Sequence, residues 1–275
     1  MSLNIASLAS GSNGNCYYIG NETEAVLVDV GISAREVERR MKRLELNPEK
    51  IRAIFISHEH SDHICGLQTF SKRYRLPVYI THSTLRNCRF KIENYLLRSL
   101  TTDPVQVGSL SISAFSKMHD AIDPYSFTIQ CGSTRVGVFT DIGTPCQNVI
   151  RHFSDCHAAF LEANYDEEML ANGSYPFYLK RRISSERGHL SNSQALELFL
   201  KHRPSYMSHL VLSHLSKNNN CPELVKNTFE ANAGAVKMIV ASRYEETAVY
   251  RISHSLVSQP PILKPARTEQ LQLAF

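Results

Sequence analysis

The sequence shows no pattern of paired cysteines and no long apolar segment. Its seven cysteines are scattered, odd in number and never spaced as C-x-x-C, so we expect neither a disulfide framework nor a cysteine-type zinc site. No run approaches the roughly 18 consecutive apolar residues of a membrane-spanning helix. The opening stretch, MSLNIASLASGSNGNC, lacks the basic start and continuous apolar core of a secretion signal. These absences predict a cytoplasmic protein without a membrane span.

A strong excess of one charge is also missing. The 275 residues carry a formal net charge of +4, and 43% of them are hydrophobic. Such a chain can bury a substantial core and is typical of a globular protein. The mild charge permits an anionic substrate but does not predict one, because proteins that bind polyanions usually show a local basic patch.

Short apolar segments alternate with helical patterns through most of the chain. Helix starts are indicated at Ser33, which with Glu36 could form a capping box, at Ser191 with Gln194, and near Pro222. Two β-rich halves with interspersed helices indicate two packed sheets with helices outside. The expected strands cover residues 3–8, 17–19, 25–30, 51–56, 78–81, 111–115, 126–130, 135–139, 158–163, 209–213, 236–241 and 247–252.

The composition changes after about residue 253. The remaining stretch, HSLVSQPPILKPARTEQLQLAF, contains three prolines and no apolar periodicity. We therefore expect residues 1–253 to form the folded domain and residues 254–275 to form an extended tail.

Four residues that can bind metals lie within six positions, directly after the apolar run 51–56. They are the three histidines and the aspartate of the segment HEHSDH, namely His58, His60, Asp62 and His63. A chain that leaves a strand can coil so that the first two face one ion and the last two face a neighbouring ion. Neutral imidazole and carboxylate suit Zn²⁺, Mn²⁺ or Fe. A polar loop with incidental histidines is the alternative, but four such residues at this spacing favour metal-dependent hydrolysis.

A site for two ions needs further ligands, and candidates follow other apolar runs. They are His119 in FSKMHD, Asp141 in VGVFTDIG and His214 in HLVLSHLS. A buried strand can hold each of these side chains rigidly at the edge of a sheet.

The order of these residues, beginning with Asp29 in LVDVGIS, resembles the metallo-β-lactamase superfamily over nearly all of residues 1–252. The resemblance implies an α/β fold, a four-layer αββα sandwich with a dinuclear site on one edge. Residues 1–253 would then be a metallo-β-lactamase-fold hydrolase domain. Within the superfamily, the segments SLASGSNGNCYYI, LVDVGIS, FISHEHSDHICGL, LEANYDEEML and GHLSNSQA are similar to the YycJ/WalJ group of DNA exonucleases.

The resemblance also implies a role for each candidate ligand. Asp141 would bridge two ions, and Asp29 would orient ligands rather than bind, although Asp29 could instead cap the following turn. Glu59 is not assigned as a ligand. The expected cofactors are two divalent ions, Zn²⁺ or Mn²⁺, with Fe and Mg²⁺ as alternatives. The implied ligand sets are His58, His60 and His119 for one ion, and Asp62, His63 and His214 for the other.

Two adjacent ions can share a hydroxide, lower its pKa and clamp the attacking and leaving oxygens. This chemistry suits displacement at phosphorus, but it also suits hydrolysis of a lactam or thioester. His189, just before a predicted helix, is similar to the ribonuclease Z histidine that protonates the leaving oxygen, and a helix N-terminus would attract an anion. Asp62 and His189 are the expected catalytic residues, with an ordinary histidine beside a helix cap as the alternative for His189.

Aromatic residues and cations are interleaved in the segment YPFYLKRR, and a further cation follows it. This pattern fits stacking on bases and pairing with phosphates, although a solvated helix face would look the same. The segment KNNN at 217–220 could extend the phosphate contacts. We therefore expect a DNA exonuclease of DNA repair that acts through a metal-bound hydroxide, with substrate-binding residues Lys180, Arg181, Arg182 and Arg187.

The last six residues, QLQLAF, resemble the hexapeptide by which bacterial DNA-repair and replication proteins dock on the β sliding clamp. A flexible tether with prolines would present the apolar side chains at low steric cost. The alternative is that the tail packs back on its own domain. The residues expected to contact the clamp are Gln270, Leu271, Leu273 and Phe275.

Two other functions stay open at this stage. A small-molecule phosphodiesterase, or another hydrolase of the same fold, would use the same ions in a narrower pocket. A non-catalytic scaffold that binds DNA or the clamp would keep the fold around a vestigial site. The complete set of candidate ligands argues against the scaffold.

Overall fold

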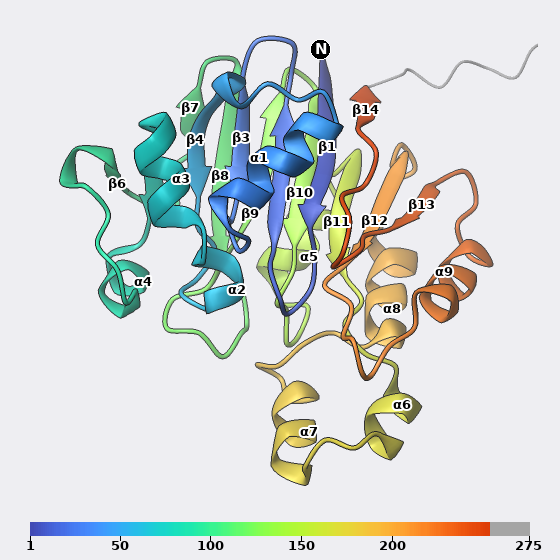
Figure 1. Ribbon diagram of the computed structural model, residues 1–275. Coiled ribbons are helices and arrows are strands. Elements are labelled where there is room, and N and C mark those ends of the chain that lie inside the picture. The colour runs from blue at the N-terminus through green and yellow to red at the C-terminus, as the bar shows by residue number, and fades with distance from the viewer. Residues whose placement is uncertain (254–275) are drawn as a thin grey trace, which may run out of the picture.

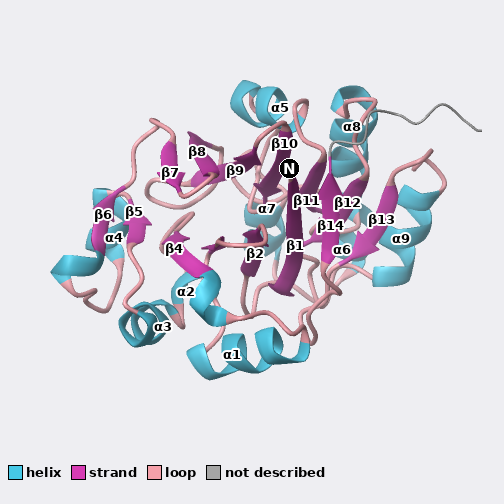
Figure 2. Ribbon diagram, turned by 90° about the horizontal axis from the view of Figure 1, so that it is seen from above, coloured by secondary structure: helices cyan, strands magenta, loops and turns pink. Residues whose placement is uncertain are grey.

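The computed structural model describes residues 1–253, in which two seven-stranded sheets pack face to face with helices on both outer faces (Figures 1 and 2). The expected four-layer αββα sandwich is thereby confirmed. The expected tail and its clamp-binding peptide, with Gln270, Leu271, Leu273 and Phe275, lie outside the described residues.

The first sheet combines antiparallel and parallel pairing. Strands β14, β1, β2 and β3 pair antiparallel, whereas β3, β4, β5 and β6 pair parallel. In sheet order the strands are β14 (Tyr250–Ser253), β1 (Ser2–Ala9), β2 (Cys16–Gly20), β3 (Ala25–Val28), β4 (Ile51–Phe55), β5 (Val78–Ile80) and β6 (Leu97–Ser99).

The second sheet has the same mixed character. Strands β7 to β10 form an antiparallel meander, and β10 to β13 pair parallel. In sheet order the strands are β13 (Lys237–Val240), β12 (His209–Ser213), β11 (Ala158–Glu162), β10 (Thr134–Phe139), β9 (Tyr125–Cys131), β8 (Leu110–Ser116) and β7 (Val105–Val107).

Strand direction brings the polar strand ends together. In the first sheet, β3 and β4 run parallel, so the residues that follow them lie at one edge. In the second sheet, β10, β11 and β12 run parallel, and β8 shares their direction because two antiparallel pairings separate it from β10. The carboxyl ends of parallel strands are where open α/β sheets bind ligands.

Helices cover both outer faces, and one pair lies beyond the strand ends. The first sheet carries α1 (Ala34–Arg43), α2 (Ser61–Ile64), α3 (Leu67–Tyr74) and α4 (His82–Asn87), and the second carries α5 (Gln147–Phe153), α8 (Asn192–His202) and α9 (Pro222–Glu230). The remaining pair, α6 (Glu167–Asn172) and α7 (Phe177–Ile183), lies below the sandwich in Figure 1. Among the helices of residues 1–253, none is long and apolar enough to cross a membrane.

Three apolar clusters hold the layers together. One fills the space between the sheets and includes Phe55, Phe127 and Phe160. The other two lie under the helices of each outer face, around Phe70 and Phe199. Burial on both faces explains why the central strands are continuous apolar runs rather than alternating ones. Removal of this apolar surface from water is the main force that stabilises the sandwich.

Local expectations are mostly confirmed, with small differences. Ser191 and Gln194 form the capping box at the start of α8. Ser33 caps α1, but the Glu36 carboxylate bonds to Arg40 and Arg39 instead of closing a second box. The three-residue strands β6 and β7 were not expected, because so short a segment carries no measurable periodicity.

Candidate metal centre

Three histidines from two different sheets form the first candidate ligand set. His58 and His60 follow β4, and His119 follows β8, yet their ligand nitrogens all lie within 4.8 Å of one another. His58 and His119 are buried. The Nε2 atom of His58 lies 3.0 Å from Nδ1 of His60, so the imidazole nitrogens converge on one small volume. This is the set that the sequence assigns to one ion.

The second candidate set consists of Asp62, His63 and His214, again within 4.8 Å. Asp62 and His63 lie in the short helix α2, and His214 follows β12. The Oδ2 atom of Asp62 is 3.5 Å from Nε2 of His63 and 3.6 Å from Nε2 of His214. The structure therefore brings together the residues that the sequence assigns to a second ion.

Asp141 lies between the two sets. Its Oδ2 is 3.2 Å from Nε2 of His63, and its Oδ1 is 3.9 Å from Nε2 of His119 and 3.5 Å from Nδ1 of His214. The carboxylate is buried and reaches candidate ligands of both sets. A bridging ligand would have to stand in this position.

An unusual backbone conformation turns three of these side chains into the site. Asp29, Asp141 and His214 have φ angles of 60°, 55° and 58°, in the left-handed region that costs a residue other than glycine about 1–2 kcal/mol. Hydrogen bonds hold His214 in place, because its N–H donates to Ser10 Oγ at 2.7 Å and its carbonyl accepts from Asn164 at 2.8 Å. Such strain concentrates at functional sites.

Asp29 lies behind the candidate ligands, where it can orient one of them. His63 Nδ1 is 2.7 Å from Asp29 Oδ2, and Ser57 donates its N–H and its hydroxyl to the same carboxylate, each at 2.8 Å. A proton on Nδ1 of His63 leaves the Nε2 lone pair facing Asp62 and Asp141. His119 is held in a similar way, since its Nδ1 donates to the Gly188 carbonyl at 3.0 Å.

Glu162, the last residue of β11, joins the site although it is not among the residues predicted from the sequence. Its Oε1 is 2.8 Å from Nδ1 of His189 and 2.9 Å from Nδ1 of His214, while Oε2 accepts the N–H groups of Ile142 and Leu190. Burial opposes the charge on Glu162, but the imidazoles of His189 and His214 hold its pKa at about 2. Its place at the end of an apolar strand, like that of Asp141, was the available signal.

The candidate ligands divide into two electrostatic classes. Burial lowers the pKa of His58 well below its usual value and that of His119 to about 3. Burial also opposes protonation of His214, but the carboxylates of Asp141, Asp62 and Glu162 outweigh it and raise the pKa of His214 to about 10. The pKa of His63 is raised by the same kind of surroundings. The first set is therefore neutral and ready to bind a cation, whereas the second must release protons to do so.

Several buried atoms of the site lack hydrogen-bond partners among residues 1–253. They include Nε2 of His119, Nε2 of His214 and Oδ2 of Asp141. A buried polar atom without a partner costs free energy, and one divalent cation in each ligand set would satisfy these atoms. The donor set is nitrogen and oxygen only, which suits Zn²⁺ or Mn²⁺. The residues present therefore fit the expected ions.

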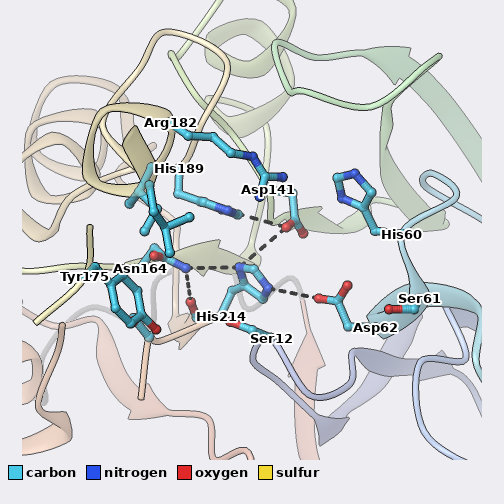
Figure 3. Close-up of a pocket in the computed structure, with 13 residues that line it drawn as sticks. Ser12, His60, Ser61, Asp62, Asp141, Asn164, Tyr175, Arg182, His189 and His214 are labelled. Atoms are coloured by element: carbon cyan, nitrogen blue, oxygen red, sulfur yellow. Dashed lines mark hydrogen bonds and ion pairs between the residues drawn. The ribbon is translucent and has the colours of Figure 1, made fainter. Parts of the chain in front are cut away.

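A pocket of about 310 Å³ gives access to these side chains (Figure 3). His60, Asp62, Asp141 and His214 project into it from different sides, and His189 points in from the start of α8. Its rim includes Ser12, Tyr175 and Arg182.

Of the four cations expected to bind substrate, only Arg182 lines this pocket, where it pairs with Asp120. Lys180 and Arg181 line a separate cavity between α6 and α7, and Lys180 donates to the Ala171 carbonyl at 2.6 Å. Arg187 donates to the His119 carbonyl at 3.2 Å and so supports a candidate ligand. In the expected phosphate track at 217–220, Lys217 is exposed, but Asn219 and Asn220 are buried.

The family model described as the metallo-beta-lactamase superfamily matches residues 9–123. The exodeoxyribonuclease YycJ of Bacillus anthracis is 33% identical over 235 residues, which cover 82% of this chain and 87% of that protein. The exodeoxyribonuclease WalJ of Streptococcus pneumoniae is 31% identical over 227 residues, which cover 80% of this chain and 84% of that protein.

Solved structures agree on the fold. The metallo-beta-lactamase fold protein YhfI of Bacillus subtilis superposes with a TM-score of 0.70 at 15% identity, covering 91% of this chain and 100% of that one. The short form of human tRNase Z gives a TM-score of 0.60 at 15% identity, covering 90% of this chain and 99% of that one. Together with the ligand sets, the family model and the two exodeoxyribonuclease relatives make the protein a metal-dependent hydrolase. The chain belongs to the metallo-β-lactamase superfamily and, within it, to the YycJ/WalJ group.

Proposed function

We propose that the chain is an exodeoxyribonuclease, which hydrolyses DNA phosphodiesters from a strand end with the help of two divalent ions. The observation that carries this proposal is the pair of ligand sets around Asp141, with His189 directed into the same pocket. Two relatives named exodeoxyribonucleases, similar over 82% and 80% of the chain, support the choice of DNA as substrate.

The first set, His58, His60 and His119, would hold one ion, and Asp62, His63 and His214 would hold the other, with Asp141 shared. When bound, the two ions would activate water and neutralise the charge that develops on the phosphate oxygens. The protein supplies a rigid frame for them, because the candidate ligands are held by strand ends and by hydrogen bonds that they donate to Asp29, Ser10 and Gly188.

His189 would donate a proton to the leaving oxygen. Its Nδ1 is fixed by Glu162 at 2.8 Å, which leaves Nε2 as the nitrogen that can meet a substrate. Oε1 of Glu162 thereby holds the ring in one orientation, with Nε2 directed away from β11. General acid catalysis of this kind contributes about 10²–10⁴-fold in rate.

Helix α7 gives the pocket a rim suited to DNA. No residue of α7 is buried, and Phe177 and Tyr178 are 75% and 74% exposed. Rings that protein does not cover can stack on unpaired bases, and neighbouring cations can pair with phosphates. Arg182, on the same helix, lies at the metal pocket, so the rim could carry a strand towards the candidate ligands.

An assay on end-labelled DNA tests this function. Single-stranded and duplex oligonucleotides are incubated with the full chain and Zn²⁺, Mn²⁺ or Mg²⁺, with cyclic nucleotides as a separate substrate. With the label at the 5′ end of one substrate and at the 3′ end of another, we expect one of the two to release labelled mononucleotides from the earliest time points. Longer labelled fragments alone from both substrates, or hydrolysis of cyclic nucleotides alone, would reject the proposal.

Matched histidine variants provide the control for this assay. His60→Ala removes a candidate ligand and should abolish DNA hydrolysis. His82→Ala changes an exposed histidine at the start of α4 and should leave the rate unchanged.

Two finer expectations go with this function and stay predictions. One is a role in DNA repair. The other is docking of residues 270–275 on a sliding clamp, which deletion of residues 269–275 tests. The truncated chain should lose clamp binding and keep hydrolysis of short DNA, and unchanged clamp binding would refute the docking.

A further inference from the structure

A second cavity, of about 300 Å³, lies next to the metal pocket. The two share Ser216, two residues beyond the candidate ligand His214. The lining of the second cavity comes mainly from the segments that follow the parallel strands β12 and β13, with Ser10 after β1. It therefore stands at the carboxyl ends of parallel strands, where ligands of such sheets bind.

Hydrogen bonds tie the wall of this cavity to the metal centre. Arg243 donates from Nη2 to the Leu215 carbonyl at 2.7 Å. The Ser10 N–H donates to the Ser242 carbonyl at 3.2 Å, while its hydroxyl accepts the His214 N–H. The guanidinium of Arg243 also passes over Gly11, where an added Cβ would lie only 3.3 Å from Nη2. These hydrogen bonds fix the wall of the cavity to the metal centre, so the cavity is a continuation of the site.

The chemistry of the lining suits a nucleotide. Lys217 is exposed and makes no ion pair within residues 1–253, and the Arg243 guanidinium bonds to a carbonyl rather than a carboxylate. Both cations therefore keep their charge for an anion. Tyr244 is 65% exposed, and its carbonyl is anchored by Arg40 at 2.9 Å, so its ring is presented on a fixed backbone.

We propose that this cavity binds the deoxynucleotide next to the scissile phosphate, with its base stacked on Tyr244 and its phosphate paired with Lys217. The proposal rests on the function proposed above and adds a substrate subsite to it. A cavity of this size is at the lower end for small-molecule sites. It is large enough for one nucleotide.

Two substitutions test the subsite on the full-length, metal-loaded chain. Tyr244→Ala should raise KM for a single-stranded oligonucleotide about tenfold, because stacking on an aromatic ring is lost. Tyr244→Phe keeps the ring, so its KM should match that of the unmodified chain. Lys217→Ala should reduce the slope of log(1/KM) against log[salt] by about 0.7, the share of one phosphate contact on a single strand. Lys201→Ala, an exposed lysine that pairs with Glu197 on α8, is the matched control and should not change the slope.

A second substrate separates binding from damage to the metal centre. Bis(p-nitrophenyl) phosphate is a diester without a nucleoside, so the cavity variants should hydrolyse it within about twofold of the unmodified chain. An unchanged KM for the oligonucleotide in Tyr244→Ala, or equal losses on both substrates, would overturn the subsite. Failure of the unmodified chain to hydrolyse DNA, while it hydrolyses the small diester, would instead overturn the proposed function and the subsite with it.

Discussion

At the scale of single residues, the chemistry depends on which nitrogen of each histidine faces the pocket. His63, His119 and His214 all use Nδ1 to contact protein oxygens, those of Asp29, Gly188 and Glu162. Their Nε2 atoms are left for a cation. The protein thus fixes which nitrogen of each ring faces the pocket before any ion binds.

A first prediction concerns His189 as a proton donor. His189→Gln should lower kcat for DNA by about 10²–10⁴-fold without loss of bound metal, because this ring belongs to neither of the two proposed ligand sets. The loss should be much smaller on bis(p-nitrophenyl) phosphate, whose leaving group departs without a proton. Equal losses on the two substrates would remove the proton-donor role, and metal content by mass spectrometry checks that the centre is intact.

A second prediction follows from the raised pKa of His214, about 10 in the folded metal-free chain against 6.5 for the free side chain. Its protonation contributes stability that is fully present below pH 6.5 and is lost as the pH rises towards 10. The free energy of unfolding of the metal-free chain should therefore fall across that range. With Zn²⁺ bound, the cation replaces the proton and the fall should be smaller.

Urea unfolding at several pH values, with chelator and with Zn²⁺, measures this difference. His214→Asn is the control, since it removes this titrating ring and should make the metal-free fall shallower, while His63, whose pKa is also raised, contributes the remainder. A metal-free stability that does not change between pH 6.5 and 10 would contradict the proposed electrostatics.

At the scale of elements, the site depends on contacts between loops that are far apart in the chain. Glu59 lies within the ligand motif, and its Oε1 accepts the N–H of Ile122 at 2.9 Å. This contact joins the loop after β4 to the loop after β8, which carries His119. Gly31 permits a similar close approach, because a Cβ there would lie 1.7 Å from the Asp62 carbonyl oxygen.

Glu59 should therefore position the first ligand set without binding an ion. Glu59→Ala should weaken metal affinity about 10–100-fold, the usual effect of losing a group that orients ligands. Glu59→Gln keeps an oxygen that can accept the Ile122 N–H and should restore most of the affinity. Competition with a chromogenic chelator gives the dissociation constants, and equal affinities for the Ala variant and the unmodified chain would contradict this role.

The sequence predicted those elements whose signal is local. Buried apolar runs revealed β4, β11 and β12, and the candidate ligands followed because each stands where a run ends. The link between Glu59 and Ile122 could not be predicted, since it joins residues 63 positions apart. Nor could the left-handed backbone of Asp29, Asp141 and His214, which tertiary contacts impose against local preference. Glu162 was missed because an isolated carboxylate carries no spacing pattern.

At the scale of the whole molecule, the centre lies at the edge of the sandwich, where strand ends of both sheets meet, and neither half is complete alone. His58, His60, Asp62 and His63 come from the first sheet, whereas His119, Asp141 and His214 come from the second. Ions bound here would join the halves of the sandwich. We therefore expect activity to need both ions, because two ions together would clamp the attacking and the leaving oxygen and each proposed set draws ligands from both sheets.

Titration of the metal-free chain with Mn²⁺ or Zn²⁺, followed by native mass spectrometry and by release of mononucleotides from DNA, tests this claim most directly. We predict that activity rises with the population of chains that hold two ions and that the His60→Ala variant never reaches it. Full activity in chains that hold one ion, or none, would contradict the account.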